Sequence, residues 1–263
     1  MSEWHPFKTG KMERINKQLS AIESRYKIKI LYACETGSRA WGFPSPDSDF
    51  DVRFIYMHER DWYLSLSRKK DSIEHMDGDF DITGWDLRKS LLLLKKANAP
   101  LIERFRSPVI YYAQPGFAED FLALVKEYYS PTAVFFHHYS LAAKFWSVLN
   151  GQQEVKLKSF FYLVRSLLSC YWITQDSALL PMNIYDLMNK IDIGMRKQLE
   201  ELIQLKAGVG EQYLHPVEEW MPDWINQMWE TLNSSKENLG TCNRGFDELN
   251  RFFLATINRY VND

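Results

Sequence analysis

The sequence has few cysteines, no excess of basic residues and no long hydrophobic run. Its three cysteines, Cys34, Cys170 and Cys242, are spread over 263 residues. Thiols so few and so far apart form neither a disulfide framework nor a zinc site, which favours a reducing compartment. Lysine and arginine (32) nearly balance aspartate and glutamate (34), for a net charge of −2. The chain therefore lacks a general signature of duplex binding, although a local basic track remains compatible with this balance.

No apolar run approaches the roughly 18 residues of a membrane span. Residues 1–11 contain no apolar stretch typical of a signal peptide. We therefore expect a soluble cytoplasmic protein that has no membrane partner. Hydrophobic residues make up 46% of the chain and aromatic residues 15%. This composition supports a substantial core in one large domain or two small ones.

Residues 34–56, CETGSRAWGFPSPDSDFDVRFIY, combine a glycine–serine pair with two aspartates. A short apolar segment leads into Gly37 and Ser38, and Asp49 follows Ser38 by 11 residues. Asp51 comes next, at the start of a second apolar run. This order predicts a strand, a tight turn with a short helix, a loop and a second strand.

The predicted geometry suits phosphate chemistry. Glycine lets the backbone approach a ligand closely, and the free N–H groups of a helix that opens at Ser38 suit a phosphate. Residues two apart on a strand share a face, so Asp49 and Asp51 would present two carboxylates together. Magnesium prefers such oxygen ligands, and two metals about 4 Å apart can assist an in-line phosphoryl displacement. The alternative is a solvated acidic loop before a core strand.

The Gly37-Ser38 pair, the step of 11 residues and the Asp49/Asp51 pair together resemble the signature of the DNA polymerase beta-like nucleotidyltransferases. The wider string GSRAWGFPSPDSDFDVRFIY looks like the predicted nucleotidyltransferase branch linked to RNA repair. The resemblance implies that the turn holds the triphosphate of an incoming nucleotide. It also implies that three carboxylates hold two divalent metals. These metals would be magnesium, or manganese instead of magnesium.

The third carboxylate is expected on a strand after the aspartate pair. The Asp-Gly sequence at 77–78 predicts a hairpin, and residues 80–85 read as its second strand. Asp81 is our choice, because the family carries its third metal ligand on such a strand. Asp79 is the alternative, since it shares the face of Asp81 if the strand starts early; a solvent-facing role for Asp81 is a third interpretation. Asp86 is better explained as a helix N-cap.

The pattern of the whole chain predicts an α+β fold. A polymerase beta-like catalytic half with a small mixed β-sheet would occupy residues 1–114, and an all-helical half residues 115–263, an arrangement common in the superfamily. In the first half we expect helices at 12–26 and 86–98 and strands at 28–33, 50–57, 80–85 and 109–112. In the second half we expect helices at 117–128, 131–149, 155–173, 184–190, 196–205, 217–234 and 244–260.

Three basic residues are candidate phosphate contacts. Lys158 and Arg165 are seven residues apart on a predicted helix and so share a face. The resemblance implies that a cation from this helix reaches the triphosphate, where it would offset charge during transfer; a solvated basic face is equally consistent. Arg39 follows the Gly-Ser turn and would contact either the phosphates or a nearby carboxylate. Lys156 is a weaker candidate.

Other residues near the motif have open roles. Arg53 shares the strand face of Asp51, where it would orient a carboxylate, touch the substrate or form an ordinary ion pair. Trp41 and Phe43 would stack on a base or belong to the core. The adjacent histidines at 137–138 do not share a helix face, so core or surface positions fit them better than metal ligation.

These features together predict a Mg²⁺-dependent nucleotidyltransferase. It would move a nucleoside monophosphate from a nucleoside triphosphate to an acceptor hydroxyl, with Asp49 and Asp51 on both metals and Asp81 on the metal nearer the attacking group. The resemblance implies an RNA end, such as that of tRNA, as acceptor. Three alternatives stay open: AMP transfer to a protein, transfer to a small molecule, and a nucleotide-binding module without activity.

Overall fold

The computed structural model describes residues 9–67, 69–176, 178–236 and 239–260. Its centre is a five-stranded sheet with the strand order β3-β4-β2-β1-β5. Strands β2 and β4 are parallel and the other neighbours are antiparallel, which confirms a mixed sheet. The strands are β1 (Lys29–Thr36), β2 (Phe50–Met57), β3 (Ser72–Asp77), β4 (Phe80–Asp86) and β5 (Ile110–Ala113).

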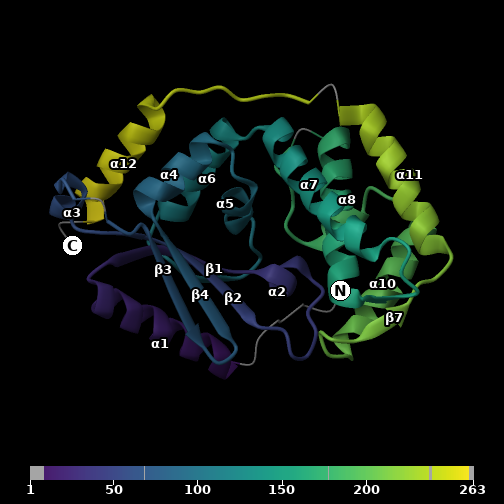
Figure 1. Cartoon of the computed structure of the whole chain (residues 1–263). Helices are drawn as coiled ribbons and strands as arrows, with labels where there is room; N and C mark the ends of the chain where they lie inside the picture. The colour runs from purple at the N-terminus through teal and green to yellow at the C-terminus, as the bar shows by residue number, and fades with distance from the viewer. Residues whose placement is uncertain (1–8, 68, 177, 237–238, 261–263) are drawn as a thin grey trace.

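Helices cover both faces of this sheet (Figure 1). On one face lies α1 (Thr9–Tyr26), whose apolar residues Ile15, Leu19 and Ile22 pack into a core with side chains of β2 and β4. Their helical spacing is the pattern from which this helix was predicted. The opposite face carries α4 (Leu87–Lys95), α5 (Ala99–Arg104) and α6 (Phe117–Tyr128).

Two short helices follow the central strands. After β1 comes α2 (Gly37–Trp41), and after β2 comes α3 (Arg60–Leu64). Gly37, with φ +64°, and Gly42, with φ +96°, occupy the left-handed region that glycine tolerates best. The chain thereby turns sharply at both ends of α2 and returns through the loop at 42–49 to β2. At the end of β4, Asp86 accepts a hydrogen bond from the Arg88 N–H, which confirms it as the N-cap of α4.

The second half is built from helices, of which α7 and α8 pack side by side along their length. One feature was not predicted: a two-stranded sheet of β6 (Glu154–Lys156) and β7 (Leu214–Pro216). Three residues with one buried side chain, Val155, are too short for a periodic pattern to register. The helices are α7 (Pro131–Leu149), α8 (Leu157–Gln175), α9 (Ile184–Met188), α10 (Ile193–Ala207) and α11 (Trp220–Ser235).

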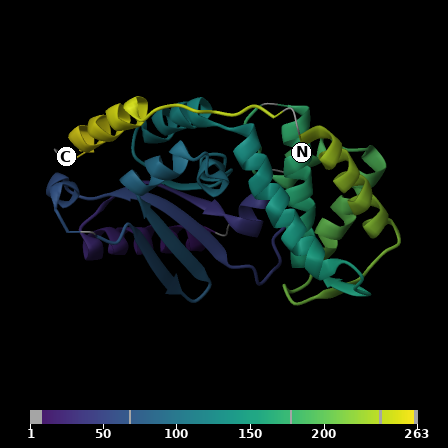
Figure 2. The same cartoon turned by 45° about the horizontal axis from the view of Figure 1, so that its top comes forward.

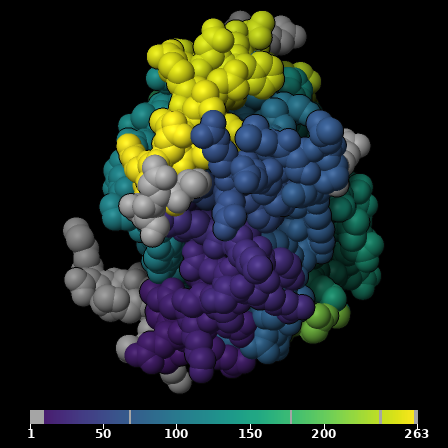
Figure 3. All heavy atoms as spheres, turned by 90° about the vertical axis from the view of Figure 1, so that its left-hand side faces the viewer, coloured from purple at the N-terminus to yellow at the C-terminus, as the bar shows by residue number. Residues whose placement is uncertain are grey.

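The last helix, α12 (Asp247–Tyr260), returns to the first half of the chain and packs on α4. Figure 2 shows it crossing back from the helical half, and Figure 3 shows it against the region that contains α3 and α4. The Tyr260 hydroxyl donates to the Pro115 carbonyl at 2.9 Å. No helix in the described ranges is long and apolar enough to cross a membrane.

One hydrophobic core connects the two halves. Phe43, from the loop before β2, is fully buried and stacks on Phe161 of α8, with ring centroids 5.3 Å apart. Phe43 is therefore a core residue. Because this contact crosses the predicted boundary near residue 114, the two halves are packed together, with the end of β1 and the start of β2 on the side of α8. The boundary itself stays a prediction.

Candidate active site

The parallel pairing of β2 and β4 sets two carboxylates side by side. Asp51 on β2 is the register partner of Asp81 on β4. The Arg53 Nη2 atom donates to Asp51 Oδ1 at 2.9 Å and to Asp81 Oδ2 at 2.7 Å. All three side chains are partly buried, with 28%, 31% and 19% of Asp51, Asp81 and Arg53 exposed. Like charges are thus held together by one shared cation.

Arg53 also fixes the backbone under this pair. Its Nη1 atom donates to the carbonyls of Asp81, at 2.8 Å, and Val52, at 3.1 Å. Of the roles left open by the sequence, the structure shows that Arg53 forms ion pairs on the sheet face and orients both carboxylates.

Asp49 lies just before β2 and is exposed. Burial raises the pKa of Asp51, and the charges of Asp81 and Asp49 raise it further, against the lowering effect of Arg53. The Asp51 carboxylate is therefore short of positive charge in spite of its ion pair. Within the described ranges, no three His, Cys, Asp or Glu side chains are already gathered closely enough to hold a metal. The donor set still fits magnesium, because Asp51 and Asp81 on adjacent strands and Asp49 just before β2 supply hard oxygen ligands.

Asp79, the alternative third carboxylate, has a different partner. It lies in the turn between β3 and β4, and its side chain forms an ion pair with Lys11 of α1. The hydrogen bond from Lys11 lowers the pKa of Asp79. The structure thus brings Asp81 beside Asp51 and ties Asp79 to the helix that covers the other face.

The glycine–serine turn contacts the carboxylates directly. A side chain on Gly37 would overlap the Asp51 carboxylate, so the backbone and Asp51 approach as closely as only glycine allows. Ser38 is buried, and its hydroxyl donates to Ser48 Oγ at 3.2 Å. Ser48 donates in turn to Glu211 Oε1 at 2.9 Å, which links the turn to the second half of the chain.

Arg39 binds main-chain carbonyls in the loop that carries Asp49. It donates to the carbonyl of Ser48 at 2.6 Å and to that of Asp49 at 3.1 Å. Its guanidinium also lies over the Phe50 ring, 4.1 Å from the centroid. Among the described residues Arg39 forms no ion pair with a carboxylate, and it shapes the backbone that leads into β2. A phosphate contact stays a prediction.

Lys158, in the first turn of α8, lies close to the carboxylates. Its Nζ is 2.5 Å from Glu211 Oε2. Burial opposes its charge, but Glu211 and then Tyr162 and Asp51 raise the pKa of Lys158. The structure therefore brings this ammonium within electrostatic range of Asp51. The nearby Lys156 instead donates to Gln212 from β6.

Arg165 is a buried residue, so its interpretation as part of a solvated basic face was wrong. Its Nη2 atom donates to Glu103 Oε1 at 2.9 Å and to the Met182 carbonyl at 3.2 Å. Its guanidinium lies 4.5 Å from the Trp41 ring centroid. Burial alone would raise the pKa of Glu103, but Arg165 and His138 hold it at about 2. This ion pair ties α5 to α8 next to the carboxylates.

A cavity of about 360 Å³ adjoins Asp51 between the sheet and helices α7 and α8. Sequence reasoning missed two of its charged lining residues. Glu103 and Arg104 are adjacent charges in the otherwise apolar string APLIERF, a signal that would have marked them as buried. The lining residues are Thr36, Gly37, Trp41, Asp51, Arg53, Trp85, Pro100, Glu103, Arg104, His137, His138, Leu141, Tyr162, Arg165 and Met182.

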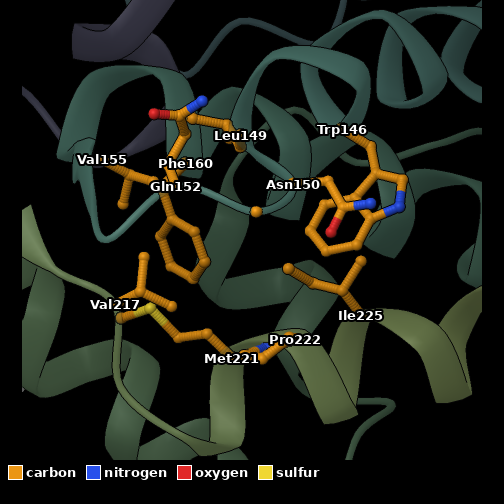
Figure 4. Close-up of a pocket in the computed structure, with 11 residues that line it drawn as sticks. Trp146, Leu149, Asn150, Gln152, Val155, Phe160, Val217, Met221, Pro222 and Ile225 are labelled. Atoms are coloured by element: carbon orange, nitrogen blue, oxygen red, sulfur yellow. The ribbon is translucent and has the colours of Figure 1, made fainter.

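A second cavity, of about 260 Å³, lies within the helical half (Figure 4). Side chains such as Trp146, Phe160, Met221 and Ile225 surround it, and no ionisable residue lines it. It therefore lacks the charge that phosphate chemistry requires.

Comparison with known proteins identifies the family. The RNA repair pathway DNA polymerase beta family, RlaP, matches residues 12–255. The chain belongs to the RlaP family. The Bacillus subtilis (strain 168) protein named "Uncharacterized protein YcgL" is 38% identical over 259 residues, which is 95% of this chain and 98% of that protein. A solved nucleotidyltransferase-like protein from Exiguobacterium sibiricum 255-15 is 10% identical, with a TM-score of 0.29 over 85% of this chain and 74% of that one.

This RlaP chain has a further carboxyl under the site that the sequence did not reveal. Glu35 on β1 is fully buried, and its Oε1 accepts a hydrogen bond from the Asp51 N–H at 2.8 Å. The Tyr111 hydroxyl donates to its other oxygen. Burial raises the pKa of Glu35 to about 7, although both hydrogen bonds lower it. Glu35 therefore positions the Asp51 backbone and titrates near neutral pH.

Glu35→Gln is expected to change how stability depends on pH. The folded-state pKa of Glu35, about 7, lies above its unfolded value, so folding is favoured at low pH and loses stability as pH rises through 7. The shift corresponds to about 3 kcal/mol between pH 4.5 and 7. Urea unfolding across this range should therefore show a steeper fall for the wild type than for Glu35→Gln. Parallel curves would contradict the buried, titrating carboxyl.

Lys158→Ala is expected to lower nucleotidyl transfer by roughly 10²-fold, the usual effect of losing one group that stabilises developing charge. Stability should change little, because Lys158 is 39% exposed and such ion pairs contribute weakly. Lys156→Ala is the matched control, since Lys156 donates to Gln212 and should leave the rate unchanged. Transfer rates and melting temperatures of the two variants check this; equal rates would remove Lys158 from the site.

Proposed function

We propose that this RlaP chain is a Mg²⁺-dependent nucleotidyltransferase that moves a nucleoside monophosphate from a nucleoside triphosphate to a hydroxyl at an RNA end, in the cytoplasm. The observation that carries the proposal is the register of Asp51 with Asp81 on parallel strands, with the Gly37 backbone against Asp51. Lys158, within electrostatic range of Asp51, adds the cation that a polyphosphate needs. Family membership supports the same chemistry.

Each residue of the site has a separate role in the proposed reaction. Gly37 and Ser38 bind the triphosphate through backbone N–H groups, and Lys158 pairs with its charge. Asp49 and Asp51 would hold both metals and Asp81 the one nearer the attacking group. When bound, Mg²⁺ supplies charge stabilisation to the attacking and leaving oxygens, and Mn²⁺ can take its place. Arg53 would release its ion pairs with Asp51 and Asp81 when these carboxylates hold metal, while its hydrogen bonds to main-chain carbonyls keep it in place.

The transfer is an in-line displacement. The acceptor oxygen forms a bond to the α-phosphorus as the bond from that phosphorus to the bridging oxygen breaks, and pyrophosphate leaves. Asp81 takes the proton from the acceptor hydroxyl. Most of the rate enhancement then comes from positioning and charge stabilisation.

Label transfer tests the acceptor. The protein is incubated with each α-labelled nucleoside triphosphate and Mg²⁺ or Mn²⁺, in parallel with tRNA, fragmented RNA, cell protein and small molecules such as aminoglycosides. An Asp49→Asn/Asp51→Asn double variant is the control. Label on RNA supports the proposal. Label on a protein or small molecule would replace RNA as the acceptor, and nucleotide binding without any label above the control would favour a binding module.

A further inference from the structure

Arg104 is a buried cation without an acidic partner. It lies on α5, is 3% exposed and lines the cavity beside Asp51. Its Nη1 atom donates to the Phe54 carbonyl at 3.5 Å, and its guanidinium carbon lies 3.4 Å from the centroid of the Trp85 ring. Among the described residues, no carboxylate lies within ion-pairing distance of it. Burial, assisted by the charge of Arg53, lowers the pKa of Arg104 to about 9, although Cys34 raises it. Such an arginine is costly unless an anion compensates it.

Other polar atoms on the same cavity also lack partners. His138 is 2% exposed, and within the described part of the chain neither of its ring nitrogens has a hydrogen bond. Its Nε2 faces Glu103 Oε1 at 3.4 Å, an ion pair when the imidazole is protonated, so Nδ1 is the ring nitrogen that faces no partner in the described ranges. The indole N–H of Trp41 is likewise buried and unpartnered. Because buried polar groups are normally satisfied, their gathering on one cavity points to a ligand with polar edges.

Among the residues that line the cavity, three arginines stand against two acids. Its two acids are already paired, Asp51 with Arg53 and Glu103 with Arg165. Arg104 is the cation left over, so the expected ligand is an anion.

The size and walls of the cavity suit a nucleotide. About 360 Å³ falls within the range of roughly 300–1,000 Å³ that is common for small-ligand pockets. The rings of Trp41, Trp85 and Tyr162 line it, and aromatic rings are the usual surfaces on which bases stack.

We infer that this cavity binds the terminal nucleotide of the acceptor, with its phosphate on Arg104 and its base between the aromatic walls, within reach of His138. Of the proposed triphosphate contacts, Gly37 lines the cavity beside Asp51, whereas Ser38 and Lys158 do not line it. Arg104 bonds to the carbonyl of Phe54, three residues beyond Asp51 on β2, so the acceptor's nucleotide would lie farther along the sheet than the triphosphate. The inference rests on the proposed function for the meaning of "acceptor", but the binding of a nucleotide at Arg104 is independent of it.

The test is binding of each ribonucleoside 5′-monophosphate, and of inorganic phosphate, by titration calorimetry in EDTA. At least one monophosphate should bind the wild type without metal. Arg104→Gln and His138→Gln should each weaken it at least 10-fold, while Asp79→Asn, outside the cavity and paired with Lys11, should leave it unchanged. Failure of all four to bind, or equal binding by Arg104→Gln, would overturn the inference.

The melting temperature of an Arg104 variant and the joint binding of two nucleotides test the inference further. Arg104→Met should not lower the melting temperature, since it removes an unpaired buried charge; a loss of folding would show that Arg104 is structural and overturn the assignment. Mg²⁺ and a nucleoside triphosphate should bind together with the monophosphate, and mutual displacement would assign the cavity to the incoming nucleotide instead. Monophosphate binding without label transfer would contradict the proposed function alone. Label transfer without monophosphate binding would contradict this inference alone.

Discussion

Replacing Asp51 by asparagine is expected to lower nucleotidyl transfer by roughly 10³-fold, because the variant loses a charged oxygen ligand at the centre of the site. The fold should survive the change. Burial and the neighbouring charges of Asp81 and Asp49 raise the pKa of Asp51. A raised carboxyl pKa means that stability is present at low pH and lost as pH rises through the folded pKa. At neutral pH, Asp51→Asn should therefore be as stable as the wild type or more stable.

Asp79→Asn provides the matched control for this prediction. Asp79 is also a partly exposed aspartate near the start of β4, but Lys11 lowers its pKa through a hydrogen bond. Its loss should reduce stability slightly and leave transfer unchanged. Asp81→Asn, by contrast, should behave as Asp51→Asn does. Transfer rates and melting temperatures of the three variants decide between the two candidates; a rate loss in Asp79→Asn alone would reverse the assignment.

Arg165→Met is expected to lower the free energy of unfolding by about 3–5 kcal/mol, the usual cost of breaking a buried ion pair on one side. Glu103 would then remain buried, with its charge facing only His138. The Met182 carbonyl would lose its two hydrogen bonds from Arg165 as well. Urea unfolding measures the effect directly.

A double-mutant cycle isolates the pair. Glu103→Gln and Glu103→Gln/Arg165→Met complete the set, and the two single changes should be strongly non-additive because both residues share one interaction. The large loss should disappear in the double variant, which has no buried carboxylate left unpaired. Additive changes, or a stable Arg165→Met protein with lost transfer, would favour a direct role for Arg165 on the phosphates.

The chain order of the elements could be predicted from local pattern. The period-3.6 spacing in α1, the exact span of β2 and the Asp86 cap each follow from a few neighbouring residues. The proximity of Asp51 and Asp81 followed only from the family resemblance. The register between β2 and β4 depends on packing that no local sequence pattern encodes. In the structure the two strands are parallel, with Asp51 opposite Asp81.

The partners of the charged residues could not be predicted in the same way. Arg165 and Lys158 share a helix face in sequence, yet Arg165 is buried against Glu103 and Lys158 meets Glu211. Both partners lie more than 50 residues away along the chain. The role of Glu35 could not be predicted either. A single glutamate in an apolar strand does not indicate that its side chain accepts a hydrogen bond from the Asp51 backbone. Long-range pairing of charges appears only once the two halves are packed together.

The most direct test of the central claim is the position of the metal. Crystals grown with Mn²⁺ and a nucleoside triphosphate analogue that cannot release pyrophosphate would be measured for anomalous scattering from manganese. We predict manganese bound by Asp49, Asp51 and Asp81, with Arg53 no longer paired to both carboxylates and the triphosphate against Gly37 and Ser38. Manganese bound elsewhere, with Arg53 still joining Asp51 to Asp81 while the nucleotide is present, would contradict the account.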